Sequence, residues 1–426
     1  MRSVRVNWRL LAVGLAAVLP LAGCGGGPAK PVGVLPRTAS DGGPVVRDYV
    51  EASSLLDRSH GWVLTPVALS MTDDGGRTWT RVTPRGVPVG QIAGVQFLTP
   101  RTAILARSQP DGFSHRVFSF YATEDAGLHW HQLPPRLTAL TPDGSPPNPG
   151  YGWVDIDFLD ARHGFVALAV EGPVQISAGD LYRTDNGGTT WRRASMLPVF
   201  GEIRFTNSKD GWLAGGSVHD RLYATHDGGR RWQPVAYETR RIVKGTVWAS
   251  WLDTPVFSDR EHGVLTTTLD IVHDPTGAKG DFPWLIFETS SDGGRSWHVA
   301  ATLPEAGCCV GTANTVLGQD SWVAVTAEGG KVVHLTEAGK KTTIVTEKVL
   351  PLYRLRSAGG TVGHAEFVDQ QHGWIEIGTG ECYQYTPDCA GYVNLYATSD
   401  GGTTWRQLLS PDIAGSRSEH HSPPRG

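Results

Sequence analysis

The octet TSDGGTTW, residues 398–405, recurs along this chain and decides its fold. Its glycines allow the positive φ of a tight hairpin, and its Asp, Ser and Thr side chains can hydrogen-bond to their own turn. Its Trp supplies a large ring that packs the hairpin against apolar surface. Related octets lie at residues 72–79, 123–130, 184–191, 225–232 and 290–297, with a degenerate copy at 335–342.

A second motif alternates with the octet. FVDQQHGW, residues 367–374, has the form Phe-x-Asp/Asn-x-x-His/Asp-Gly followed by an aromatic residue or Val. Similar segments begin at residues 55, 158, 205 and 257, and weaker copies lie at 97–104 and 316–322. Each of these segments precedes one octet, so the chain divides into seven repeated units.

Apolar and polar residues alternate on both sides of each motif, which is typical of strands joined by short turns. Each unit therefore predicts four strands, and almost no segment shows helical periodicity. One four-stranded sheet cannot bury both its faces, so neighbouring sheets must stack around an axis. The sequence predicts an all-β fold, a seven-bladed β-propeller of four-stranded antiparallel blades, over residues 45–410.

The repeat also assigns a role to the acidic residues of the octets. Because each recurs at one position of a hairpin, we interpret these aspartates as structural and not catalytic. They are Asp74, Asp125, Asp227, Asp292 and Asp400.

The N-terminus is typical of a lipoprotein signal peptide, residues 1–23. Three arginines precede an apolar run that is shorter than the roughly 20 residues of a spanning helix. The following Leu-Ala-Gly-Cys resembles a bacterial lipobox, in which Cys24 would become the lipidated first residue; the alternative is an ordinary secretory peptide. We expect a flexible tether at 24–44, a disordered tail at 411–426, and export to the outer side of the cytoplasmic membrane or to the cell envelope.

Composition excludes some partners. The chain has 38 Lys and Arg against 42 Asp and Glu, a formal net charge of −4, which argues against a nucleic-acid-binding surface. No metal or cofactor motif is present, so none is predicted. Export favours disulfides among the four remaining cysteines. Cys382 with Cys389 is the preferred pair, a Cys308–Cys309 bridge is then left, and cross-pairing stays open.

The octets resemble the Asp-box, or bacterial neuraminidase repeat, of sialidases and several other propeller families. The alternating motif is more similar to the photosystem II assembly-factor family of seven-bladed propellers, whose bacterial relatives include exported and lipid-anchored proteins. Sialidase catalysis requires an arginine triad, a Tyr–Glu pair, an acid/base Asp and an early Phe/Tyr-Arg-Ile-Pro motif. The sequence lacks that tetrapeptide, so the sialidase resemblance is confined to the repeat.

The insertions predict where a site would lie. In a blade with strands A to D, the A–B and C–D turns share one face, which we name the turn face. The B–C and D–A connections share the other, the insertion face, and hold the long insertions. These insertions are residues 133–155, 238–253, 269–285, 303–311 and 379–393.

We predict a binding surface on the insertion face, rich in aromatic and basic residues. Its candidates are Trp153, Arg240, Arg241, Lys244, Trp248, Trp251, Trp284, Tyr383 and Tyr385. The alternative is that these rings only pack the loops onto the propeller. No catalytic residue is predicted. Asp253, His273, Asp274 and Asp281 lie in the same insertions, but no spacing pairs them as acids or ligands.

The sequence therefore favours a monomeric, non-catalytic binding or assembly module whose partner is an envelope protein or glycan. The alternative is an exo-sialidase-like or other glycoside hydrolase acting on surface glycans. A structural or sensor propeller is a third reading that the sequence does not separate from the first.

Overall fold

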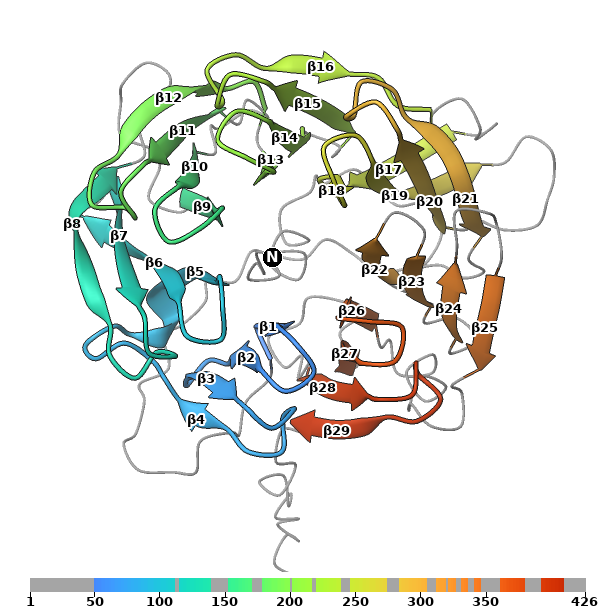
Figure 1. Ribbon diagram of the computed structural model, residues 1–426, viewed down its shortest axis with the longest axis horizontal. Coiled ribbons are helices and arrows are strands. Elements are labelled where there is room, and N and C mark those ends of the chain that lie inside the picture. The colour runs from blue at the N-terminus through green and yellow to red at the C-terminus, as the bar shows by residue number, and fades with distance from the viewer. Residues whose placement is uncertain are drawn as a thin grey trace, which may run out of the picture.

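The computed structural model describes residues 50–111, 115–138, 152–170, 178–199, 201–216, 220–238, 246–273, 283–304, 312–318, 321–326, 331–335, 341–345, 361–379 and 392–409. These residues form seven antiparallel sheets, the blades, arranged around a central axis (Figure 1). Within each blade the strands follow chain order from the axis outward. The predicted all-β, seven-bladed propeller of four-stranded blades is confirmed.

The first three blades span residues 52–197. Blade 1 contains β1 (Ala52–Leu55), β2 (Gly61–Leu64), β3 (Leu69–Thr72) and β4 (Thr80–Arg81). A 3-10 turn, η1 (Val89–Gln91), leads into blade 2 with β5 (Ile92–Phe97), β6 (Ala103–Asp111), β7 (His115–Thr123) and β8 (His131–Thr138). Blade 3 contains β9 (Gly152–Phe158), β10 (Gly164–Val170), β11 (Ala178–Thr184) and β12 (Arg192–Leu197).

The remaining blades span residues 201–409. Blade 4 contains β13 (Gly201–Phe205), β14 (Gly211–Gly215), β15 (Arg221–Thr225) and β16 (Gln233–Val235). Blade 5 contains β17 (Thr246–Leu252), β18 (Val256–Phe257), β19 (Gly263–His273), β20 (Pro283–Ser290) and β21 (His298–Pro304). Blade 6 contains β22 (Thr312–Gly318), β23 (Ser321–Thr326), β24 (Lys331–Leu335) and β25 (Lys341–Val345). Blade 7 contains β26 (Thr361–Phe367), β27 (Gly373–Thr379), β28 (Tyr392–Thr398) and β29 (Arg406–Leu409).

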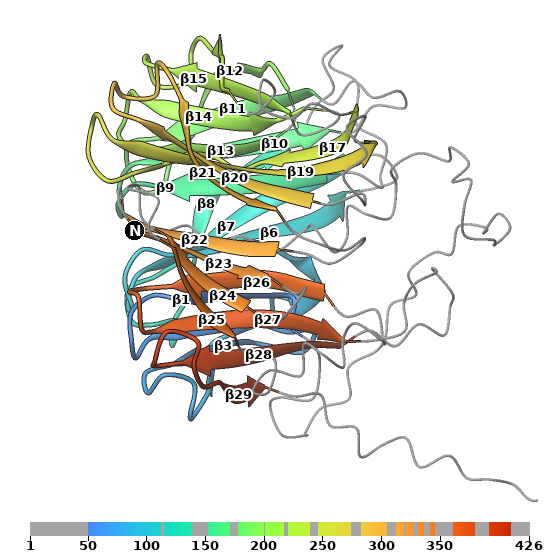
Figure 2. The same cartoon turned by 90° about the vertical axis from the view of Figure 1, so that its right-hand side faces the viewer.

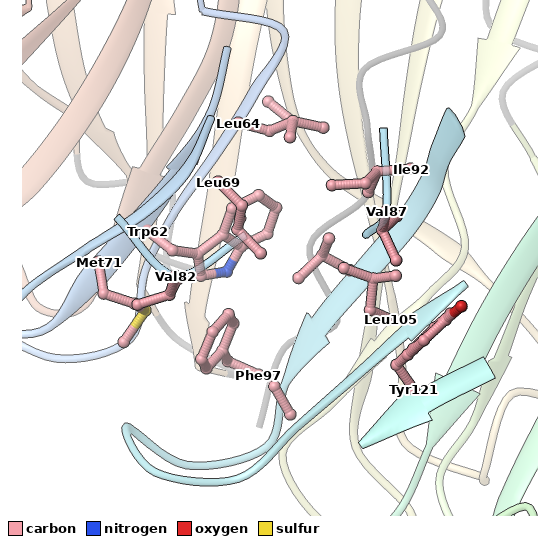
Figure 3. Close-up of a cluster of buried hydrophobic side chains, with 13 residues drawn as sticks. Trp62, Leu64, Leu69, Met71, Val82, Val87, Ile92, Phe97, Leu105 and Tyr121 are labelled. Atoms are coloured by element: carbon pink, nitrogen blue, oxygen red, sulfur yellow. The ribbon is translucent and has the colours of Figure 1, made fainter. Parts of the chain in front are cut away.

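The hydrophobic core is divided among the seams between neighbouring blades, because each sheet buries both faces. Seven apolar clusters are described, one at each seam. Between blades 1 and 2, Trp62 and Leu64 face Phe97, Leu105 and Tyr121 (Figure 3). Burying such side chains stabilises each seam by about 1.5–3 kcal/mol per residue.

The ring closes without an exchanged strand in the described ranges, because blades 1 and 7 are each built from one continuous segment. Side chains make this closure. The seam cluster includes Leu55 and Val63 of blade 1 and Trp374 and Leu395 of blade 7. In the side view the short turns lie along the left edge and the insertion face is on the right (Figure 2). Within the described residues, no helix has the length and apolarity to span a membrane.

Candidate functional site

Each octet forms a turn whose carboxylate is bound by its own backbone and hydroxyls. In blade 1, Asp74 Oδ1 accepts the N–H groups of Arg77 at 2.8 Å and Thr78 at 2.9 Å. The Thr72 hydroxyl donates to the same oxygen at 2.8 Å, and the Thr78 hydroxyl donates to Oδ2 at 2.8 Å. The octets that contain Asp125, Asp227, Asp292 and Asp400 repeat this pattern of hydrogen bonds with small changes. The geometry gives these aspartates a turn-forming role.

The second motif forms a similar turn between the first two strands of a blade. Asp57 Oδ1 accepts the N–H groups of Ser59 and His60, both at 2.8 Å, while His60 Nδ1 lies 2.8 Å from Oδ2. The same arrangement recurs at three further aspartates, Asp160, Asp259 and Asp369. The histidine of the motif is thus a partner of its own aspartate and part of the turn.

Within the described residues, a backbone hydrogen bond joins the two motifs in six of the seven blades. In blade 1 the Gly75 N–H of the octet donates to the Ser59 carbonyl of the other turn at 2.7 Å. Six blades show this bond; the acceptors in the other five are the carbonyls of Arg101, Arg162, Lys209, Glu261 and Gln371. The motifs alternate in sequence because each pair builds one two-turn unit.

Aromatic contacts also join the two motifs of one blade. In blade 4 the octet ring of Trp232 meets Phe205 of the second motif edge to face, with centroids 6.1 Å apart. Blades 3, 5 and 7 repeat this contact through Phe158–Trp191, Phe257–Trp297 and Phe367–Trp405. The glycine after the histidine leaves room for the phenylalanine: a Cβ at Gly164 would lie 2.5 Å from the Phe158 ring.

These hydrogen bonds hold the turn carboxylates in their ionised form. Donation from the backbone N–H of His262 and then Glu261, followed by the His262 ring, lowers the pKa of Asp259 to about 2. The backbone N–H and then the ring of His129 lower the pKa of Asp125 to about 2. A general acid working near neutral pH needs a pKa close to neutrality, so these turns are unsuited to acid–base catalysis.

Sequence reasoning missed a set of polar links between blades. The residue just before the second motif reaches the innermost strand of the neighbouring blade. Gln96 Oε1 accepts Phe158 N–H at 2.8 Å, and Glu366 Oε2 accepts Leu55 N–H at 3.1 Å. Asp157 accepts Phe205 N–H, and Thr315 Oγ1 accepts Phe367 N–H at 3.2 Å. These side chains differ in type and share only an acceptor oxygen, so the repeat gave no signal for them.

A depression of ≈ 430 Å³ lies at the axis on the turn face. It is lined by blades 1, 2, 6 and 7, with Leu55, Phe97, Leu317 and Phe367 among its walls. Arg58 Nε and Asp369 Oδ2, 2.8 Å apart, lie beside it at the seam of blades 1 and 7. Within the described ranges no group of three His, Cys, Asp or Glu side chains is arranged to hold a metal ion.

The structure places the predicted tryptophans by their strands. Trp248 and Trp251 lie in β17 and Trp284 lies in β20, so three of the four belong to blade 5. Both strands pair with β19, in which Thr268 is opposite Trp251 and Leu269 is opposite Trp284. At 11 residues, β19 is the longest described strand and runs toward the insertion face (Figure 2). Trp153 lies apart from these, in β9 of blade 3.

The two insertions predicted in blade 5, residues 238–253 and 269–285, are partly strand and not wholly loop. Residues 246–252 form β17, the inner strand of blade 5, which Asp253 to Pro255 separate from β18. Asp253 therefore follows the inner strand, where its Oδ2 accepts the Thr266 hydroxyl at 2.8 Å. His273 ends β19.

The remaining predicted positions lie outside the described residues. They are Arg240, Arg241, Lys244, Asp274, Asp281, Tyr383, Tyr385 and the cysteines Cys24, Cys308, Cys309, Cys382 and Cys389.

No family model matches the chain. The photosystem II stability/assembly factor HCF136, chloroplastic, of Cyanidioschyzon merolae is 36% identical over 70 residues, which cover 16% of this chain and 14% of that protein. The solved structure of YCF48 bound to D1 peptide is 15% identical with a TM-score of 0.38, covering 87% of this chain and 83% of the other. Prolyl oligopeptidase B from Galerina marginata is 11% identical with a TM-score of 0.50, covering 86% of this chain and 53% of the other. The chain is thus a seven-bladed β-propeller with weak, local homology to a photosystem II stability/assembly factor.

Proposed function

We propose that this protein is a lipid-anchored, extracytoplasmic binding or assembly module that holds an envelope protein against its insertion face and performs no catalysis. The observation that carries the proposal is the concentration of tryptophans in blade 5: Trp248 and Trp251 lie in β17 and Trp284 lies in β20, the two strands that flank β19. Tryptophan is enriched among the residues that dominate protein–protein binding energy. A rigid blade is also a precise support for such residues.

The contrast between the two faces supports this assignment. On the turn face the carboxylates of both motifs are occupied by hydrogen bonds within their own turns, as at Asp74 and Asp57. That face therefore repeats one structural unit around the ring. The insertion face is where the blades differ from each other in length and sequence, and such variation suits recognition of one particular partner.

Chain direction supports an anchor on the binding side. β1 runs from the insertion face toward the turn that follows Leu55. A chain lipidated at Cys24 would therefore enter the propeller on its insertion face and hold that face toward the membrane. The local match to a stability/assembly factor agrees with an assembly role more than with glycoside hydrolysis.

Affinity capture of the full-length chain from its own cell envelope tests the proposal. The variant carries Trp248→Ala, Trp251→Ala and Trp284→Ala, and the control carries Leu128→Ala on the turn face, where Leu128 is 64% exposed. We expect an envelope protein retained by the native chain and the control, with at least tenfold less on the variant, since hot-spot truncations cost about 2 kcal/mol or more.

Circular dichroism must first show that the triple variant keeps its β-sheet content. Equal capture by the variant, or hydrolysis of aryl glycosides by the native chain, would overturn the proposal. Loss of membrane association in Cys24→Ser would separately verify the anchor.

A further inference from the structure

The octet of blade 3 differs from the others at one chemically important position. Residues 184–191 read TDNGGTTW, so Asn186 stands where five other octets have aspartate, and Gly187 follows it. Asparagine followed by glycine is the dipeptide most prone to deamidation, because glycine has no side chain to shield its backbone nitrogen. This Asn-Gly pair is the single one in the sequence.

We propose that Asn186 is a modification site that deamidates to aspartate when its turn opens, and that the folded turn suppresses the reaction. The Gly187 nitrogen attacks the side-chain carbonyl carbon of Asn186. A carbon–nitrogen bond forms, the bond to Nδ2 breaks, and ammonia leaves with the proton from the Gly187 N–H. Water then opens the cyclic imide, which gives aspartate or its isoaspartyl isomer at position 186.

Hydrogen bonds hold both reacting groups in the folded turn. Asn186 Oδ1 accepts the Thr190 N–H at 2.9 Å and the Thr184 hydroxyl at 3.0 Å, while Nδ2 donates to Thr190 Oγ1 at 3.0 Å. The Gly187 N–H donates to the Arg162 carbonyl at 2.7 Å. Attack requires the nitrogen to lose that bond and the side chain to rotate, so the reaction follows local opening of the two-turn unit.

The blade 7 octet shows that an aspartate product fits. It shares the GGTTW ending, and Asp400 accepts the Thr404 N–H at 2.8 Å and the Thr404 hydroxyl at 2.6 Å. At position 186 only the bond to the Thr190 hydroxyl would reverse its direction, with the hydroxyl becoming the donor. Deamidation to aspartate therefore completes the octet, whereas the isoaspartyl product adds a backbone carbon and disrupts the turn.

Peptide mapping by mass spectrometry tests this on the full chain, aged folded and in urea. We expect deamidation of Asn186 to be slower by about tenfold or more in the folded chain, because local opening limits it. Thr190→Val should speed the reaction in the folded chain and leave the rate in urea unchanged. The matched variant in blade 7, Thr404→Val, should leave the rate at Asn186 unchanged in both conditions.

Two results would overturn the protective role of the turn. Equal rates in folded and unfolded chain, or a Thr190→Val variant that is folded by circular dichroism and no faster, would show that the turn does not protect Asn186. Asn186→Asp should also have a higher melting temperature than the native chain. A lower one would show that an aspartate does not complete this octet.

Discussion

The Ser53 hydroxyl of blade 1 donates a hydrogen bond of 2.7 Å to Glu376 Oε1 of blade 7, across 323 positions of sequence. Both side chains are buried, at 3% and 1% exposure. Glu366 of the same blade accepts Leu55 N–H nearby. Because no strand is exchanged between these two blades in the described ranges, side-chain bonds and apolar packing hold the ring closed.

A double-mutant cycle on this pair measures what the closure contributes. Ser53→Ala, Glu376→Ala and the double variant should show a coupling free energy of about 1–3 kcal/mol in denaturant unfolding, because each single change leaves a buried polar partner without its bond. Additive effects of the two substitutions would contradict a direct role of this bond in ring closure.

The Asp-box interpretation predicts a sharp difference between two neighbouring aspartates. Asp74→Ala removes the acceptor of four turn hydrogen bonds and should lower the melting temperature by a few degrees. Asp73→Ala changes an exposed neighbour and should shift it by less than about one degree. Similar losses for both variants in a thermal melt would show that net charge, and not the turn geometry, accounts for the effect.

The lowered aspartate pKa values predict loss of stability in acid. For Asp125 and Asp259 the folded pKa is about 2, below the ordinary value of 3.8, so their stabilisation is present above about pH 4 and lost as the pH falls toward 2. Asp259→Asn keeps an acceptor but cannot titrate. Its unfolding midpoint should therefore depend less on pH in that window, and a slope equal to that of the native chain would contradict the account.

Blade 2 contains an alanine where the other clear octets have glycine. Ala126 has φ 65°, whereas Gly75 and its counterparts lie at 69–74°. Left-handed backbone costs alanine about 1–2 kcal/mol, and glycine loses about 0.5–1 kcal/mol of chain entropy, so Ala126→Gly should stabilise the protein by about 0.5–1 kcal/mol. The reciprocal Gly75→Ala should destabilise it. Chemical denaturation measures both, and a destabilising Ala126→Gly would contradict the strain.

The fold could be predicted from the sequence because each of its turns requires particular residue types at fixed positions. The octet requires positive φ at its glycines, as seen at 72° for Gly75 and 82° for Gly76, and an acceptor such as Asp74 to close the turn. Both requirements involve residues of a single turn, so the same residue types recur in the sequence wherever the turn recurs. The bond between the turns, as from Gly75 N–H to the Ser59 carbonyl, could not be predicted because a backbone carbonyl carries no residue preference.

The candidate site was less accessible to prediction. The side chains linking adjacent blades, such as Gln96 and Glu366, fill one position with unrelated residue types. In blade 5 the inner strand is interrupted after Leu252. The strand segment TVWASWL, residues 246–252, therefore does not run directly into the motif that begins at Phe257, and in the sequence it resembles an insertion. Strand pairing, which the sequence does not display, places Trp251 and Trp284 on either side of β19, opposite the consecutive residues Thr268 and Leu269.

Site-specific photo-crosslinking tests the central claim most directly. Three variants each carry a photoreactive phenylalanine analogue at one position: Trp251 or Trp284 of blade 5, or Leu128 of the turn face. Each variant is expressed in the cells from which the protein comes. The proposal predicts a crosslinked envelope protein from the two blade 5 positions and none from position 128. Crosslinking from position 128 with none from blade 5 would contradict it and place the binding surface on the turn face.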